Sequence, residues 1–270
     1  MLKRSRAVKS RYCKIVQMFV LLACLMLVAS AGQAEQPMKT TITPQAISIG
    51  AFYDGTHVKA EGLIPADSQA IIRITGYNGD LHLKQKGKAL GLLWMNLNTL
   101  TFENVPSVYL LYVPGTFEEM LQSNSAIDPV SQLTLASLEK QIQISPESGN
   151  KDQLFAEFLK LKKSEGLYAV HKDSIHYSDT NDGVKSFEAD LIIPSRIKPG
   201  EYTLDLYAVK DGQITARKSL DLPVKLVGFP AMLSSLAFQH GALYGILATL
   251  VALFAGLLMG FFFSGAKAGH

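Results

Sequence analysis

The most informative absence in this chain of 270 residues is that of cysteine from nearly its whole length. Cys13 and Cys24 are the only two, and both lie within the first 34 residues. The rest of the chain therefore cannot form a disulfide framework, use a thiolate nucleophile or bind zinc through sulfur.

The chain also lacks an excess of positive charge outside its N-terminus. Six of its 26 Lys and Arg residues lie within the first 14 positions, so residues 35–270 carry 20 basic and 23 acidic side chains. Nucleic-acid binding depends on a basic patch that neutralises phosphates, and the composition of this region offers none. We therefore expect no nucleic-acid partner.

Motifs of common active sites are missing as well. The sequence contains no Gly-rich phosphate loop, Gly-x-Ser-x-Gly elbow, His-Glu-x-x-His pair or calcium loop. His171 and His176 are the closest histidines, but on a strand their odd offset would place them on opposite sides, which favours surface histidines over a metal site. We expect no catalytic residue, no metal and no cofactor, and a protein that is not an enzyme, although a triad assembled in space would leave no such motif.

The N-terminal 34 residues have the three-part layout of a secretory signal. A cationic segment precedes an almost wholly apolar run from Ile15 to Val28, and small residues follow at 29–34. We expect residues 1–34 to be a cleaved signal peptide. The alternative is an uncleaved anchor, since the apolar run is barely long enough to span a bilayer.

A second apolar run, from Leu243 to Phe263, contains no charged residue. At about 1.5 Å per residue, a helix of this length crosses a hydrocarbon core of about 30 Å. The sequence thus predicts one transmembrane helix at 243–263 and a short cytoplasmic tail at 264–270. The dense positive charge at the N-terminus favours a cytoplasmic start and an exported middle region.

Small residues recur every four positions along this predicted helix, at Ala248, Ala252, Gly256 and Gly260. Such a row lets a second helix approach closely, so we expect the helix to pack against a second copy of the chain or another membrane protein. The alternative is that Gly and Ala are simply common in membrane helices. Residues 228–241 have the apolar pattern of an interfacial amphipathic helix.

The region between the two ends, 38–227, is predicted to be mainly β. Runs that indicate short strands include 47–52, 70–74, 81–84, 186–193 and 201–209. Lys210-Asp211-Gly212 is typical of a hairpin turn. Residues 117–165 have helical spacing instead. We expect an antiparallel immunoglobulin-like (Ig-like) sandwich with a helical insertion at 117–165, in which the last strands complete the sheets that the first strands begin.

The last helix of this insertion has an apolar stripe followed by basic residues. The stripe consists of Leu154, Phe155, Phe158 and Leu161. The basic residues are Lys160, Lys162 and Lys163, which we interpret as charges that complement the C-terminal end of the helix dipole.

A stretch from Gly91 to Tyr112 mixes aromatic and amide side chains, and it offers candidate ligand- or partner-binding residues. They are Trp94, Asn96, Asn104 and Tyr109. The alternative interpretation is a tryptophan of the sandwich core followed by a turn at 104–106.

Several short motifs, in this order, resemble a family of uncharacterised transmembrane proteins described chiefly from alphaproteobacteria. They are Gly91-x-x-Trp94-x-Asn96, Phe102-x-Asn104-Val105-Pro106-Ser107-x-Tyr109, Pro194-Ser195-x-Ile197-x-Pro199-Gly200-x-Tyr202-Thr203, Val227-Gly228-Phe229 and Leu243-Tyr244-Gly245. The resemblance implies a periplasmic β domain with one C-terminal transmembrane helix, and no activity. Genes of the family often lie beside permeases of the sulfite/organosulfonate exporter type, an association that transfers no functional residue.

Together these features predict a single-pass protein of the bacterial inner membrane with most of its chain in the periplasm. We expect an accessory or binding protein whose partners are the lipid bilayer and a multi-pass permease of the sulfite/organosulfonate exporter type. The alternative is a self-associating envelope scaffold, a homodimer formed through the transmembrane helix, with no role in transport.

Overall fold

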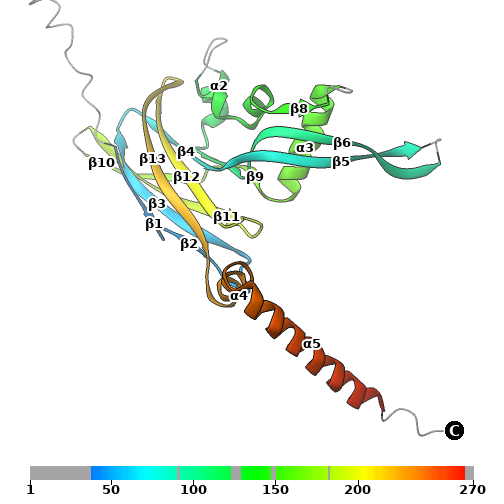
Figure 1. Ribbon diagram of the computed structural model, residues 1–270. Coiled ribbons are helices and arrows are strands. Elements are labelled where there is room, and N and C mark those ends of the chain that lie inside the picture. The colour runs from blue at the N-terminus through cyan, green and yellow to red at the C-terminus, as the bar shows by residue number, and fades with distance from the viewer. Residues whose placement is uncertain (1–37, 90–91, 123–128, 147–149, 182, 265–270) are drawn as a thin grey trace, which may run out of the picture. The chain divides into compact units, whose positions relative to one another are not determined.

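The computed structural model describes residues 38–89, 92–122, 129–146, 150–181 and 183–264 (Figure 1). The predicted signal peptide at 1–34 and residues 265–270 of the predicted tail lie outside the described residues. Most of the described chain up to residue 226 forms β-strands, which are arranged in three sheets.

The first sheet has four antiparallel strands. Their order is β1 (Lys39–Thr43), β3 (Gly55–Pro65), β11 (Val184–Pro194) and β10 (Ile175–Asn181).

The second sheet has six strands. Their order is β2 (Ile47–Ile49), β13 (Gln213–Leu226), β12 (Gly200–Lys210), β4 (Gln69–Gly76), β7 (Tyr109–Val113) and β9 (Tyr168–Lys172). The two outermost pairings, β2 with β13 and β7 with β9, are parallel, and the others are antiparallel. A parallel pair needs a long crossover, which the helical segment between β7 and β9 provides.

These two sheets pack face to face as a sandwich, as the sequence predicts (Figure 1). Strands from both ends of the chain share each sheet, because β11 pairs with β3 and β12 pairs with β4. The predicted hairpin turn between β12 and β13 is also confirmed: Asp211 and Gly212 both take positive φ, and Lys210 pairs with Gln213.

The central strands of the six-stranded sheet, β12, β4 and β7, are buried on both faces. Along β12, Leu204 and Leu206 face the four-stranded sheet, whereas Tyr207 and Val209 face a second cluster of apolar residues on the other side. That second cluster includes Phe117 and residues of the helical segment. A strand buried on both sides reads as a continuous apolar run, as β7 does over Tyr-Leu-Leu-Tyr-Val.

The segment predicted as a helical insertion contains short helices and one strand. Its elements are α2 (Phe117–Gln122), the 3₁₀ helices η1 (Ser131–Leu133) and η2 (Leu135–Lys140), β8 (Gln143–Ser145) and α3 (Lys151–Ser164). The side chain of Asn150 caps α3 by accepting a hydrogen bond from the backbone N–H of Asp152 at 3.0 Å.

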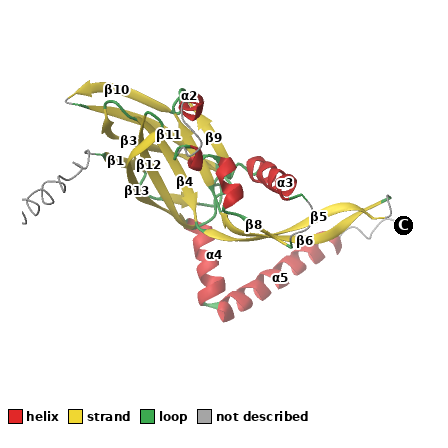
Figure 2. Ribbon diagram, turned by 90° about the horizontal axis from the view of Figure 1, so that it is seen from above, coloured by secondary structure: helices red, strands yellow, loops and turns green. Residues whose placement is uncertain are grey.

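The third sheet is a long hairpin that pairs with β8 at its base. The hairpin, which we call the arm, consists of β5 (Asn78–Ala89) and β6 (Leu93–Pro106). Its two strands run side by side beyond the rest of the β domain in both views (Figures 1 and 2). The alternative interpretation of a turn at 104–106 is wrong, because β6 continues through these residues and Asn104 takes positive φ beside a bulge in the strand pairing.

Aromatic packing holds the base of the arm. Phe102 of β6 stacks on Phe158 of α3 with ring centroids 4.9 Å apart, and Phe158 meets Tyr168 of β9 edge to face at 5.8 Å. All three side chains are fully buried. This cluster joins the arm to the helical segment and to the six-stranded sheet.

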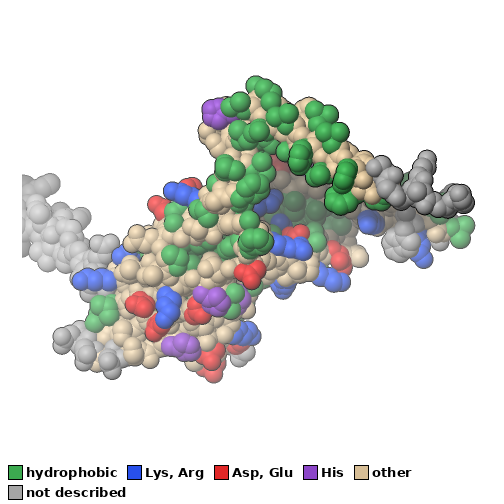
Figure 3. Space-filling view, turned by 90° about the horizontal axis from the view of Figure 1, so that it is seen from below, with side chains coloured by type: hydrophobic (Ala, Val, Ile, Leu, Met, Phe, Trp, Pro, Cys, Tyr) green, Lys and Arg blue, Asp and Glu red, His purple; other side chains and the backbone are tan. Residues whose placement is uncertain are grey.

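Two helices follow the sandwich. They are α4 (Gly228–Gln239) and α5 (Gly241–Ser264). Among the described residues, α5 is the one helix long and apolar enough to cross a membrane, over Gly241–Phe263. Figure 3 shows hydrophobic side chains gathered over these helices, whereas charged side chains lie over the sheets.

We expect Phe158→Ala to lower the free energy of unfolding by about 3–5 kcal/mol, because it leaves a cavity between the buried rings of Phe102 and Tyr168. Urea unfolding of the full chain in non-ionic detergent, followed by circular dichroism, measures the change. Leu161→Ala is the matched control: it lies one turn further along α3 with 38% of its surface exposed. This control should cost about 1 kcal/mol or less, and equal losses in the two variants would contradict the assigned packing.

Candidate functional site

The outer half of the arm is the most exposed part of the β domain. From the pair formed by Lys84 and Thr99 outward, the described side chains are exposed. The strands continue from this pair to Ala89 and Leu93, a distance of roughly 17 Å at the usual rise per residue. In the described structure, nothing covers this part of the arm.

The outer half of the arm presents polar and apolar residues on its two faces. Lys86 pairs with Asn96 and Lys88 pairs with Trp94 on one face, since residues directly opposite each other share a face of a two-stranded ribbon. The intervening positions Leu93 and Met95 belong to the other face, and they are 70% and 51% exposed. Leu92 at the tip is also exposed. Water does not stabilise such a row of apolar side chains, so a partner or a bilayer is expected to cover it.

The four candidate binding residues do not form a single face. Trp94 and Asn96 lie on the outer half of the arm, whereas Asn104 lies at its base, about 26 Å from Asn96 along the strand. Asn104 accepts a hydrogen bond from the amide of Asn78 at 2.8 Å. Tyr109 is buried in β7 and donates its hydroxyl to the carbonyl of Leu133 at 2.8 Å. A shared ligand surface for all four therefore has no support in this geometry.

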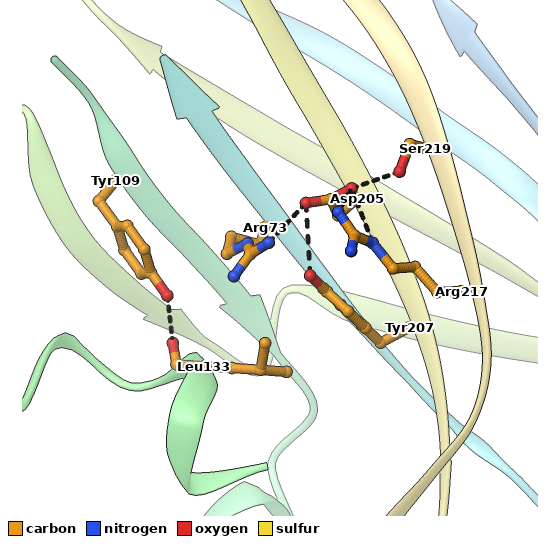
Figure 4. A network of polar contacts seen from close by, with 7 residues as sticks. All are labelled: Arg73, Tyr109, Leu133, Asp205, Tyr207, Arg217 and Ser219. Atoms are coloured by element: carbon orange, nitrogen blue, oxygen red, sulfur yellow. Dashed lines mark hydrogen bonds and ion pairs between the residues drawn. The ribbon is translucent and has the colours of Figure 1, made fainter. Parts of the chain in front are cut away.

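A network of charged side chains surrounds the buried carboxylate of Asp205, on the face of the six-stranded sheet turned away from the sandwich core (Figure 4). Asp205 is 1% exposed, and both of its carboxylate oxygens accept hydrogen bonds. The donors are Arg73 at 2.7 Å, Arg217 at 2.9 and 3.2 Å, Ser219 at 2.6 Å and Tyr207 at 3.3 Å. Strand register produces this arrangement, because Arg73 and Ser219 lie directly opposite Asp205 on the two neighbouring strands.

The electrostatics of this network are those of a structural ion pair. Burial alone would raise the pKa of Asp205, but the hydrogen bonds from Ser219, Arg73 and Arg217 outweigh it and hold the pKa below the ordinary value. Burial raises the pKa of Tyr207 to about 12. The side chain of Asp205 is closed to solvent and its acceptors are engaged, so the cluster stabilises the sheet and offers no open position for a substrate.

A cavity of about 300 Å³ lies at the base of the arm. The arm, the end of α3 and the loop between β11 and β12 all contribute to its walls, and Lys162, Arg196 and Lys198 bring three cations to it. The sequence predicts that Lys162 complements the helix dipole and that Leu161 belongs to the apolar stripe of α3. In the structure Lys162 is the buried residue of the two, and Leu161 is exposed. Its spacing of seven from Phe155 and four from Phe158 is the signal that would have indicated this.

The histidines in the described part of the chain are dispersed and do not gather in one place. Among the described residues, no group of three His, Cys, Asp or Glu side chains is placed to hold a metal ion. His171 of β9 stacks on the ring of Tyr112 with centroids 4.8 Å apart, and burial lowers its pKa. His176 is exposed on β10.

The row of small residues in α5 faces no described neighbour. Ala248, Ala252, Gly256 and Gly260 are exposed, and a side chain added at either glycine would meet no atom within 4 Å. Their packing partner stays a prediction.

We expect Asp205→Asn to lower the free energy of unfolding by about 3–5 kcal/mol at pH 7, because it leaves buried arginine charge without its counter-ion. The depressed pKa means that the carboxylate stabilises the fold fully above about pH 4, and that this stabilisation disappears as the pH falls through the folded-state pKa. The difference between wild type and variant should therefore shrink in acid.

Denaturant unfolding from pH 7 to pH 3 measures this difference. Asp221→Asn, at an exposed position of β13, is the control and should change little at any pH. A difference between wild type and Asp205→Asn that stays constant down to pH 3 would contradict the role given to the carboxylate.

Comparison with known proteins identifies the family to which the chain belongs. The model of a family described as "Putative transmembrane protein (Alph_Pro_TM)" matches residues 37–264, which include the sandwich, the arm and both C-terminal helices. A search of curated proteins finds no match to the chain. The resemblance inferred from the short motifs is thereby confirmed. The chain belongs to this family of transmembrane proteins, and it is a membrane protein with one candidate C-terminal membrane helix, α5.

Proposed function

We propose that this protein is a membrane-tethered accessory protein that binds a membrane-embedded partner through its arm and through α5. The candidate partner is a multi-pass permease of the sulfite/organosulfonate exporter type. In this proposal the protein resides in the bacterial inner membrane, with residues 1–34 as its export signal and its β domain in the periplasm.

The arm is the observation that carries this proposal. A two-stranded ribbon without a third strand or a covering layer is marginal in water, so its outer half gains stability when a partner covers it. Its exposed Leu92, Leu93 and Met95 resemble the apolar core of a protein interface, and the polar residues Lys86 and Asn96 resemble its rim. Because α5 restricts the domain to the neighbourhood of a bilayer, a membrane protein is the partner that the arm meets at the highest effective concentration.

The small-residue row of α5 supports the same proposal, and it also supports the rival one. Close approach of a second helix would fill the space beside Gly256 and Gly260. If that second helix belongs to another copy of this chain, the protein is a self-associating scaffold. The accessory function requires a permease to contact α5 and the arm, whereas the scaffold requires a second copy of this chain to do so.

Site-specific photocrosslinking in native membranes separates them. A photoreactive residue is placed at Leu93 in one variant and at Gly256 in another, and the crosslinked species are identified by mass spectrometry. We expect both positions to crosslink to the same multi-pass permease. A photoreactive residue at Glu61, exposed on β3 of the four-stranded sheet, is the control and should not capture it. Crosslinks only between copies of the chain would favour the scaffold, and crosslinks to lipid alone would exclude both functions.

The double substitution Leu93→Ser and Met95→Ser should weaken recovery of the partner by about tenfold or more, since hot-spot side chains at interfaces typically contribute over 1 kcal/mol each. The thermal stability of the isolated protein should hardly change, because both side chains are exposed before binding. Ile192→Ser removes an apolar side chain that is 47% exposed on β11 and is the matched control. Equal loss of partner in the control would show that the effect does not belong to the arm.

A further inference from the structure

The cavity at the base of the arm combines a buried cation with an opening to solvent. Three separate parts of the chain form it: the first residues of β5 with the end of β6, the last turn of α3, and the loop between β11 and β12. At about 300 Å³ it lies at the small end of the range for ligand sites. Its position, where three elements meet, is typical of such sites.

Lys162 is the key residue of this cavity. Its side chain is only 9% exposed, and its nearest counter-charge is Glu165, whose carboxylate lies 3.8 Å from Nζ. That distance is too long for a hydrogen bond, and the ammonium makes none to any described residue. Burial lowers the pKa of Lys162, Glu165 opposes this effect, and the nearby charge of Lys198 adds to it. A largely buried ammonium without a hydrogen-bonded carboxylate gains stability from a ligand that brings it acceptors and negative charge.

The loop between β11 and β12 brings two more cations to the same cavity. Arg196 and Lys198 flank Ile197, which is buried in the sandwich core and anchors the loop. The hydroxyl of Tyr202, itself on the cavity wall, donates to the carbonyl of Lys198 at 2.8 Å. These contacts fix the backbone of the loop while both cationic side chains remain exposed.

The acidic residues of the cavity do not cancel these charges. Asp80 and Glu165 also line it, so three cations face two carboxylates. Glu165 is the ion-pair partner of Lys162, and Asp80 is exposed on the arm. The cavity therefore keeps a net positive charge, and Lys162 is the least exposed of its three cations.

We propose that this cavity is a binding site for a small oxyanion, such as a sulfate, sulfonate or phosphate group, held by Lys162 from within and by Arg196 and Lys198 from the solvent side. An oxyanion supplies charged acceptors to the Lys162 ammonium, and the planar guanidinium of Arg196 can bind two of its oxygens at once. The site is independent of the proposed partner, because it depends on residues of this chain alone. The anion can be free in solution or belong to a lipid headgroup, since both present the same oxygens.

Isothermal titration calorimetry on the full chain in non-ionic detergent tests the site. Sodium sulfate, methanesulfonate and phosphate are titrated separately at constant ionic strength set with chloride. We expect saturable binding of at least one of them, with the affinity reduced about tenfold or more by Lys162→Met or by Arg196→Gln. Lys162→Met should not unfold the protein, because a hydrophobic side chain replaces a poorly paired buried charge. Arg196→Gln changes an exposed residue and gives a second, independent readout.

Lys163→Met is the matched control, because Lys163 is the exposed neighbour of Lys162 on the same helix turn. Its affinity should equal that of the wild type. Titration of the detergent-solubilised chain with short-chain phosphatidylglycerol, compared with short-chain phosphatidylcholine, identifies the source of the anion: binding that requires phosphatidylglycerol and Lys162 assigns the site to a lipid headgroup. The proposal is overturned if neither the free anions nor the phosphatidylglycerol bind, or if Lys162→Met and Lys163→Met weaken binding equally, which indicates diffuse surface charge.

Discussion

The central strands of the six-stranded sheet have to bury both of their faces, and most of the β domain is arranged to satisfy that requirement. One face packs on the four-stranded sheet, and the other is covered by α2, the 3₁₀ helices and the base of the arm. A carboxylate placed on such a face is costly unless it is fully paired. Asp205 meets this condition through donors on both neighbouring strands, so the register of β4, β12 and β13 and the charge network depend on each other.

The need to cover the sheet also explains why the base of the arm is buried and its outer half is exposed. Phe102 at the base is used to cover the sheet, through its contact with Phe158. The outer half extends past everything that the described chain can pack against it. A feature that contributes nothing to the core, yet exposes apolar side chains to water, is more readily explained by binding than by folding. The arm is therefore a more suitable contact surface than the buried network of Asp205.

The cavity beside Lys162 lies at the boundary between these two parts. Its walls include the first residues of the arm as well as the loop that leads into β12. A ligand held there would contact both the arm and the sandwich. Tyr77, between β4 and β5, and Asp80 of β5 line the cavity beside the point where the chain leaves the second sheet for the arm.

Much of the architecture follows from local patterns that a sequence displays directly. The uncharged run at 243–263 predicts α5, because only a continuous apolar helix satisfies its backbone inside a bilayer. Period-two alternation predicts the strands, and Asp211 followed by Gly212 predicts the hairpin turn, because both residues tolerate positive φ. The short motifs indicate the family, whose model matches residues 37–264.

Only the tertiary structure decided which residues share a site. Local sequence does not predict the arm, because Asn104 and Pro106 have the composition of a turn, whereas pairing of Val105 and Pro106 with β5 continues β6 through this point. Lys162 was assigned to the helix dipole, since three neighbouring lysines look equivalent until packing selects the one on the buried face of α3. The sequence by itself therefore determined the membrane helix, the β class and the family. Long-range packing decided the arm, the charge network and the cationic cavity, because each depends on contacts between residues far apart in the chain.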